Sequence, residues 1–90
     1  MYLEIVSPEA TLFKGEVESV AVPGVNGEFE MLNNHAPIVS TLKKGPVKIF
    51  GDITLEEEVE GKFEKGKDRG TWLIINSGTI ELKDNKIIVL

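Results

Sequence analysis

Turn signals recur about every 8 to 12 residues along this chain and separate short apolar runs. They include the pairs Ser7-Pro8, Pro23-Gly24, Gly45-Pro46, Gly51-Asp52, Ser77-Gly78 and Asp84-Asn85. No segment reads as a long helix, because glycines bracket the one helical candidate, residues 55–61, too closely for a stable helix. The spacing predicts an all-β fold, a small antiparallel β-sandwich or flattened barrel of about eight to ten short strands.

Alternation of polar and apolar residues predicts where these strands lie. The expected strands cover residues 2–6, 17–22, 29–32, 38–42, 47–49, 72–75, 79–82 and 86–90. Residues 53–63 are charged but β-branched at intervals, and we expect the three glutamates at 56–58 to form a solvated strand. The residues expected to point inward are Leu3, Ile5, Val20, Val22, Phe29, Ile49, Leu73, Ile75 and Ile80. Trp72 is expected in the core, and the apolar last strand has to pair inside a sheet.

The composition limits the classes of function. We expect the 90 residues to form one domain, residues 1–90, without a membrane-spanning run or a secretory signal, and therefore to be cytoplasmic. The absence of cysteine excludes disulfides and thiolate chemistry. The net charge of −5 disfavours nucleic acids and anionic lipid as partners. The best basic cluster, Lys62, Lys65, Lys67 and Arg69, alternates with acidic residues and is expected to be a solvated loop.

Catalytic and metal-binding patterns are missing from the sequence. A zinc site usually takes three or four His, Cys or carboxylate ligands, and this chain has one histidine and no cysteine. No serine lies in a nucleophile motif that could work together with His35. No Gly-Lys-Ser/Thr follows Gly24 and Gly27, so these glycines do not make a phosphate loop. We therefore expect no catalytic residue, no metal, no cofactor and no small-molecule substrate. A hydrolase using His35 is the weakest alternative, because it lacks partner residues.

A second alternative is a free-standing β-barrel module that binds an oligosaccharide or single-stranded nucleic acid. Such barrels use exposed aromatic side chains and basic grooves. The acidic balance and an aromatic content of 7% leave little for stacking once the core is filled.

The stretch Pro23 to Pro37, PGVNGEFEMLNNHAP, combines turn formers, the single histidine and a strand-breaking proline. Glycine and asparagine tolerate the positive φ of tight turns, so the stretch predicts a shaped loop on a β scaffold. Shaped loops on rigid sheets often carry function.

Several motifs in order resemble the β-sandwich domain of the F-type ATP synthase epsilon subunit, which is called delta in mitochondria. These motifs are Val6-x-Pro8-Glu9, Phe13-x-Gly15-x-Val17, Pro23-Gly24-x-x-Gly27 and His35-Ala36-Pro37. The resemblance is strong over residues 3–51 and weaker over residues 72–90. It departs from the family where residues 30–34, EMLNN, replace a Gly-Ile-Leu-Pro-like passage.

The resemblance implies a non-catalytic rotor subunit that binds the gamma subunit and stands on the c-ring, peripheral to the cytoplasmic face of a bacterial inner membrane. It assigns a c-ring-facing end to Asn26, Gly27, Glu28, Asn33, Asn34 and His35. It assigns a gamma-facing side to Val39, Ser40, Thr41, Leu42, Ser77, Gly78, Thr79 and Ile80. Many family members continue into two C-terminal helices that can inhibit hydrolysis, and some bind ATP there. Because the printed sequence ends at Leu90, the resemblance implies a short form without these helices, and so without the inhibition or the ATP site.

Overall fold

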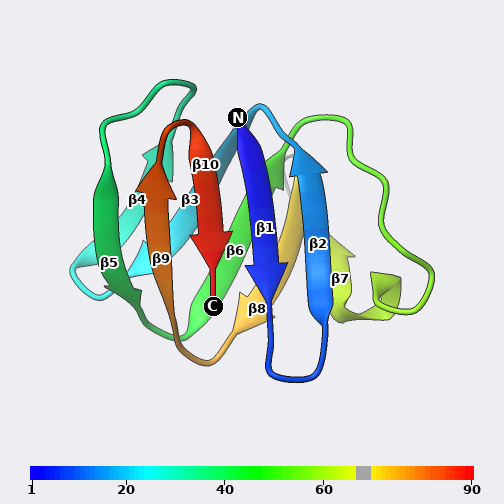
Figure 1. Ribbon diagram of the computed structural model, residues 1–90. Coiled ribbons are helices and arrows are strands. Elements are labelled where there is room, and N and C mark those ends of the chain that lie inside the picture. The colour runs from blue at the N-terminus through cyan, green and yellow to red at the C-terminus, as the bar shows by residue number, and fades with distance from the viewer. Residues whose placement is uncertain (67–69) are drawn as a thin grey trace.

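In the described part of the chain, ten short strands form a single sheet that curls over itself into two layers (Figure 1). The structure, a computed structural model, describes residues 1–66 and 70–90. The first layer contains, in spatial order, β2 (Thr11–Glu16), β1 (Tyr2–Val6), β10 (Lys86–Val89), β9 (Gly78–Lys83) and β5 (Ile38–Leu42). The second contains β4 (Gly27–Met31), β3 (Ser19–Gly24), β6 (Gly45–Phe50), β8 (Thr71–Ile75) and β7 (Phe63–Lys65). The predicted all-β sandwich or flattened barrel is confirmed.

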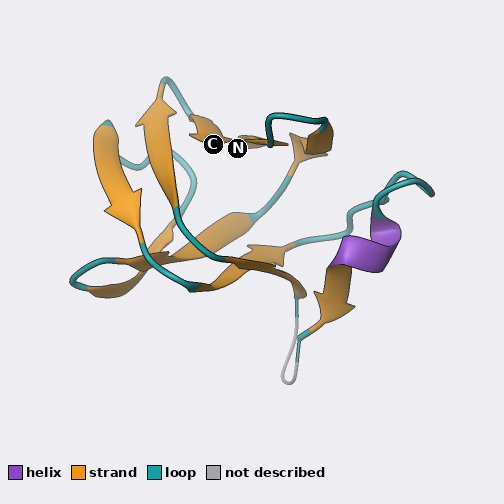
Figure 2. Cartoon of the chain, turned by 90° about the horizontal axis from the view of Figure 1, so that it is seen from below, coloured by secondary structure: helices purple, strands orange, loops and turns teal. Residues whose placement is uncertain are grey.

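The two layers join at one corner, where Gly24 of β3 pairs with Leu42 of β5. Figure 2 shows the chain from one end, with the layers facing each other across the core. All pairings between the described strands are antiparallel except that of β1 with β10, which is parallel. β10 pairs with both β1 and β9, so the apolar last strand lies inside the sheet as predicted.

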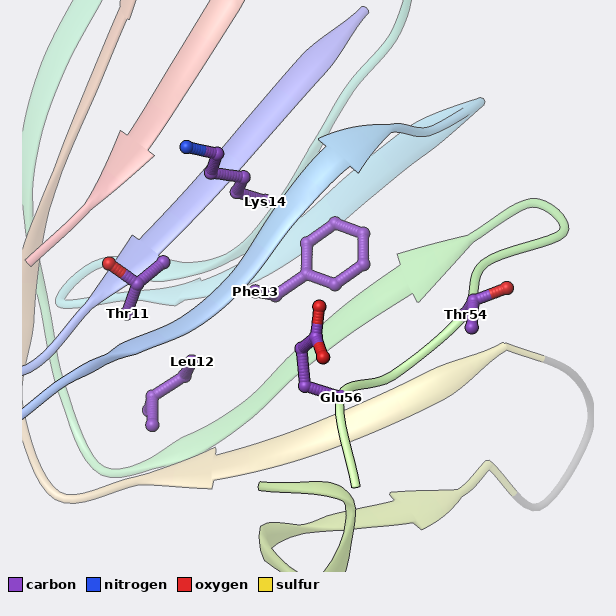
Figure 3. Close-up of a pocket in the computed structure, with 6 residues that line it drawn as sticks. All are labelled: Thr11, Leu12, Phe13, Lys14, Thr54 and Glu56. Carbon is purple, nitrogen blue, oxygen red and sulfur yellow. The ribbon is translucent and has the colours of Figure 1, made fainter. Parts of the chain in front are cut away.

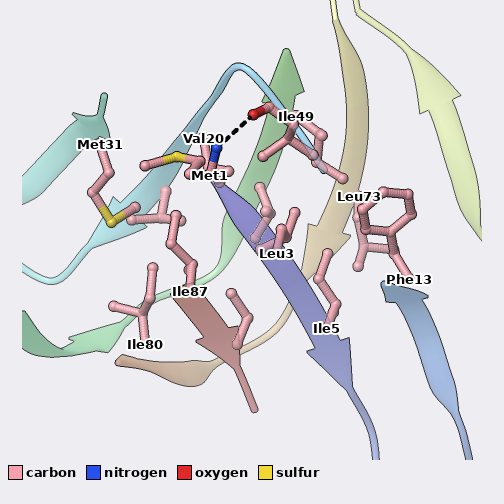
Figure 4. Close-up of a cluster of buried hydrophobic side chains, with 14 of the residues drawn as sticks. Met1, Leu3, Ile5, Phe13, Val20, Met31, Ile49, Leu73, Ile80 and Ile87 are labelled. Atoms are coloured by element: carbon pink, nitrogen blue, oxygen red, sulfur yellow. Dashed lines mark hydrogen bonds between the residues drawn. The ribbon is translucent and has the colours of Figure 1, made fainter. Parts of the chain in front are cut away.

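Alternation along the strands places the core between the layers. In β1, Leu3 and Ile5 are buried, while the residues on either side of each are half-buried on the outer face. The predicted inward residues are all buried except Phe29 and Ile75, which are half-buried. The largest fully buried side chains are Leu3, Met31, Leu42, Ile49, Ile80, Leu82, Ile87, Val20, Val22 and Val47. Figure 4 labels six of them, Leu3, Val20, Met31, Ile49, Ile80 and Ile87.

Strand β2 was not predicted, because its sequence breaks the alternation. Leu12 and Phe13 are adjacent apolar residues, and the pairing of β1 with β2 shifts register between Ile5 and Val6. Phe13 is buried, and Leu12 packs against the rim of the core. The strand β3 also continues through Pro23 and Gly24, which were expected to end it. Pro23 contributes its carbonyl oxygen, which accepts a hydrogen bond from the Lys43 N–H (2.8 Å).

The expected solvated strand at residues 56–58 is wrong, and the next strand, β7, begins at Phe63. The Glu56 carbonyl oxygen accepts hydrogen bonds from Val59 N–H (3.1 Å) and Glu60 N–H (3.0 Å), which makes a turn that leads into a short 3-10 helix, η1 (Glu60–Lys62). The backbone of residues 56–62 therefore pairs some of its polar groups within its own turn. Of the predicted basic cluster, Lys62 and Lys65 are exposed, and the other two members lie outside the described residues.

Candidate interaction surfaces

The residues that the resemblance assigns to one c-ring-facing end lie at opposite ends of β4 (Figure 1). The first group, residues 26–28, belongs to the hairpin that joins β3 to β4, whereas residues 33–35 follow β4 at its other end. The strand β4 has five residues and rises about 3.3 Å per residue, so its two ends lie roughly 13 Å apart. The structure thus divides the predicted end into two surfaces. We call them the hairpin end (residues 24–28 with Lys43 and Lys44) and the asparagine end (residues 33–35 with Asn85).

The hairpin end is a tight turn fixed against the neighbouring strand. Val25 and Asn26 form the two-residue turn between the paired Gly24 and Gly27, and neither has a positive φ. Gly27 has φ 127°, a conformation that favours glycine. The Val25 N–H donates to the Thr41 carbonyl oxygen (3.2 Å). Asn26 and Glu28 are exposed, and the hairpin borders a shallow depression of ≈ 310 Å³ lined by residues 24–29 and Ser40.

Glu28 is not a free carboxylate. Its Oε1 lies 2.8 Å from the Nζ of Lys48, and that ammonium lies 4.6 Å from the centroid of the Trp72 ring. Lys48 is flanked on the outer face of the second layer by Ala21 on β3 and Trp72 on β8. Ala21 of β3 is buried beneath these side chains. The contacts among Glu28, Lys48 and Trp72 therefore connect β4, β6 and β8 across β3.

Trp72 does not fill the core as predicted. It is half-buried on the outer face and is not part of the buried apolar cluster between the layers. Its neighbours Leu73, Ile74 and Ile75 are all apolar, so the sequence gives no alternation to show which face Trp72 occupies. Lys48 covers the ring, and such contacts contribute about 0.5 to 1 kcal/mol at exposed sites.

The asparagine end is held together by internal hydrogen bonds. The Asn85 side chain donates to Asn33 Oδ1 (2.8 Å) and accepts from the Asn34 N–H (2.8 Å). Asn33 Oδ1 also lies 3.4 Å from the α-ammonium of Met1, which donates to the Val17 carbonyl oxygen (3.2 Å). Asn85 has φ 62° in the predicted turn with Asp84 (φ 52°), a type I′ geometry that joins β9 to β10. Asn33 and Asn34, where the sequence departs from the family, thus join the loop after β4 to the N-terminus and to the β9–β10 turn.

The predicted gamma-facing residues are neighbours on β5 and β9. Thr41 pairs with Thr79, and Val39 pairs with Glu81. Leu42 and Ile80 are each 1% exposed and lie in the core, so their side chains are not available to a partner. Val39 is 78% exposed and points away from the core. The remaining members are exposed or half-buried: Ser40, Thr41, Ser77, Gly78 and Thr79.

Sequence reasoning did not single out the two lysines of the hairpin end. Lys43 and Lys44 directly precede the Gly45-Pro46 turn, and both are exposed. The signal that could have found them is this adjacent pair of like charges at a turn, next to an apolar strand.

His35 and the depression beside β2 are the two described places where catalytic groups could gather. His35 is exposed, and its Nδ1 lies 2.7 Å from the carbonyl oxygen of the adjacent Ala36. The depression between β2 and residues 54–56, ≈ 260 Å³, is lined by Thr11, Leu12, Phe13, Lys14, Thr54 and Glu56 (Figure 3). The described lining of the depression has no histidine, and none of its hydroxyl groups forms a hydrogen bond with a described side chain that could act as a base.

Neither a metal-ligand group nor a membrane-spanning helix occurs in the described part of the chain. Within residues 1–66 and 70–90, no three His, Cys, Asp or Glu side chains gather into a group that could hold a metal ion. Among the same residues, no helix has the length and apolar character needed to cross a membrane.

Comparison with known proteins identifies the family. Residues 1–90 match the family described as ATP synthase, Delta/Epsilon chain, beta-sandwich domain. The ATP synthase epsilon chain of Leptospira borgpetersenii serovar Hardjo-bovis (strain JB197) is 40% identical over 80 residues, which are 88% of this chain and 63% of that protein. The epsilon chain of Chlorobaculum tepidum is 36% identical over 88 residues, 98% of this chain and 84% of that protein. The chain therefore spans less than two thirds of the Leptospira relative.

A solved structure shares the fold. A chain in the cryo-EM structure of the Tetrahymena thermophila mitochondrial ATP synthase, central stalk and c-ring, superposes with a TM-score of 0.72 at 12% identity. The match covers 98% of this chain and 60% of that chain. Together with the family match over residues 1–90, this confirms the resemblance: the chain belongs to the delta/epsilon family of ATP synthase subunits, as a β-sandwich domain.

Proposed function

We propose that this chain is a non-catalytic central-stalk subunit of a proton- or sodium-translocating F-type ATP synthase. It links the gamma subunit to the c-ring and supports the coupling of ion flow to ATP synthesis. Residues 1–90 act as one domain, peripheral to the cytoplasmic face of a bacterial inner membrane, without a cofactor, a nucleic acid or a small-molecule substrate. The observation that carries the proposal is the family match over residues 1–90.

The geometry of the two ends supports a specific orientation. The asparagine end uses its polar side chains in hydrogen bonds to Met1 and to its own turn. The hairpin end presents Val25, Asn26 and a rigid backbone to solvent. We therefore assign the c-ring contact to the hairpin end, and the gamma contact to the outer surface of β5 and β9 around Val39, Thr41 and Thr79. A contact that transmits torque needs stiff elements and does not need reactive groups.

Co-elution with the cognate gamma subunit tests the rotor role. We expect a stable complex, and we expect Val39→Asp to weaken it about tenfold, because a charge would be buried in an apolar contact. Ile74→Asp is the matched control, since Ile74 is an exposed apolar residue (47%) on the outer face of the other layer. Failure to co-elute at micromolar concentrations would favour the free-standing binding module.

Cysteine crosslinking separates the two ends. The chain has no cysteine, so single substitutions are unambiguous reporters. We expect Asn26→Cys to form a disulfide with a cysteine placed in the polar loop of the c subunit within the assembled complex. Asn34→Cys, at the other end of β4, should form none. A crosslink from Asn34→Cys alone would reverse the orientation, and none from either position would refute a c-ring contact at these loops.

A further inference from the structure

The charge of the hairpin end comes from lysines, not from its glutamate. The Glu28 carboxylate is paired with Lys48 at 2.8 Å, so these two charges offset each other at close range. Lys43 and Lys44 are exposed, and neither forms an ion pair with any residue in the described ranges. The hairpin end therefore presents two unpaired positive charges on a chain whose net charge is −5.

The backbone holds these lysines beside the hairpin. The Lys43 N–H donates to the Pro23 carbonyl oxygen (2.8 Å), and Gly24 pairs with Leu42. Gly45 then passes so close to Pro23 that a Cβ at this glycine would lie 3.0 Å from the proline Cβ. The turn that carries Lys43 and Lys44 is thus locked to the β3–β4 hairpin and moves with it.

An exposed apolar side chain lies next to these charges. Val25 is 51% exposed at the tip of the hairpin, where a tight turn usually carries a polar residue. Its N–H is bonded to the Thr41 carbonyl oxygen, two residues before Lys43. Val25, Lys43 and Lys44 therefore form one surface, which we call the lysine edge.

We propose that the lysine edge binds an acidic polypeptide segment of the partner, one that presents Asp or Glu carboxylates beside an apolar side chain. This inference rests on the proposed function, because it describes the chemistry of the surface that meets the c-ring. Ammonium groups next to an apolar tip complement carboxylates that flank an apolar residue. A nucleic acid would require a larger positive field than two lysines supply on an acidic protein. In this assignment Glu28 is paired with Lys48, and Lys43 and Lys44 meet the partner.

Charge reversal tests this inference in the complex of this chain with its cognate gamma subunit and c-ring. We expect Lys43→Glu with Lys44→Glu to weaken binding of the gamma-bound chain to the c-ring about tenfold at 0.1 M salt. The difference should shrink at 1 M salt, where the screening length is only about 3 Å. The matched control, Lys62→Glu with Lys65→Glu, makes the same change in net charge on η1 and β7 and should change binding less than about twofold. Unchanged thermal unfolding of both double variants would show that they are folded.

A charge swap identifies the partner group. Replacing the acidic residues of the c-subunit loop by lysine should restore binding of the Lys43→Glu, Lys44→Glu variant. If the unmodified chain binds the c-ring and the double variant binds equally well or more tightly, the inference is overturned while the proposed function stands. If the unmodified chain does not bind the c-ring at all, the proposed function fails, and the inference fails with it.

Discussion

Replacing Ile87 by alanine should lower the free energy of unfolding by about 2 to 5 kcal/mol. Ile87 is fully buried in β10, where it pairs with Leu3 on one side and Leu82 on the other. The substitution removes apolar contacts from the strand that connects β1 to β9, and close-packed neighbours relax only partly into the space. A domain of this size has a total stability of about 5 to 15 kcal/mol, so the loss is a large fraction of it.

The adjacent residue provides the control for this prediction. Ile88 is half-buried on the outer face of the same strand, opposite Glu4 and Glu81. Ile88→Ala should cost about 1 kcal/mol or less, because little of its contact area faces the core. Urea unfolding followed by circular dichroism measures both variants. Equal losses would contradict the assignment of Ile87 to the core and Ile88 to the outer face.

The fold could be predicted from the sequence where alternation and turn chemistry agree. Residues 2–6 alternate in burial, and β1 has the predicted bounds. The Asp84-Asn85 pair tolerates positive φ, and it forms the predicted turn between two strands. Prediction failed at residues 56–58, which were expected to form a solvated strand but lie in a turn closed by hydrogen bonds to the Glu56 carbonyl oxygen. The sequence pattern does not show which hydrogen-bond partners a backbone segment finds.

The candidate site was less predictable because it depends on contacts between distant residues. Glu28 and Lys48 are 20 positions apart, and their ion pair exists only because β3 lies between β4 and β6. The hairpin end and the asparagine end are close in sequence, yet the strand between them extends and separates them. The predicted strand at residues 29–32 already implied this separation, so the sequence did contain the signal. The hydrogen bonds of Asn85 to residues 33 and 34 span more than half of the chain and had no local pattern.

Gly24→Ala should lower the free energy of unfolding by about 2 to 3 kcal/mol and should displace the hairpin end. A Cβ at this position would lie 2.8 Å from the Gly27 carbonyl oxygen and 2.8 Å from Cε1 of Phe29. Backbone atoms of the same hairpin cannot move aside without breaking the pairing of Gly24 with Gly27 and with Leu42. The strain therefore acts at the corner where the two layers join.

The functional consequence distinguishes this glycine from one that only stabilises the fold. Gly61→Ala is the control, because a Cβ there would meet nothing within 4 Å, and its effect should stay within about 0.5 kcal/mol. Since the lysine edge is bonded to the strand that Gly24 ends, Gly24→Ala should also reduce the crosslink from Asn26→Cys to the c-subunit loop. Co-elution with gamma, which we assign to β5 and β9, should persist at temperatures where the variant is folded. Unchanged stability together with an unchanged crosslink would show that the hairpin accommodates a side chain at Gly24, and the corner would then not fix the geometry of the c-ring contact.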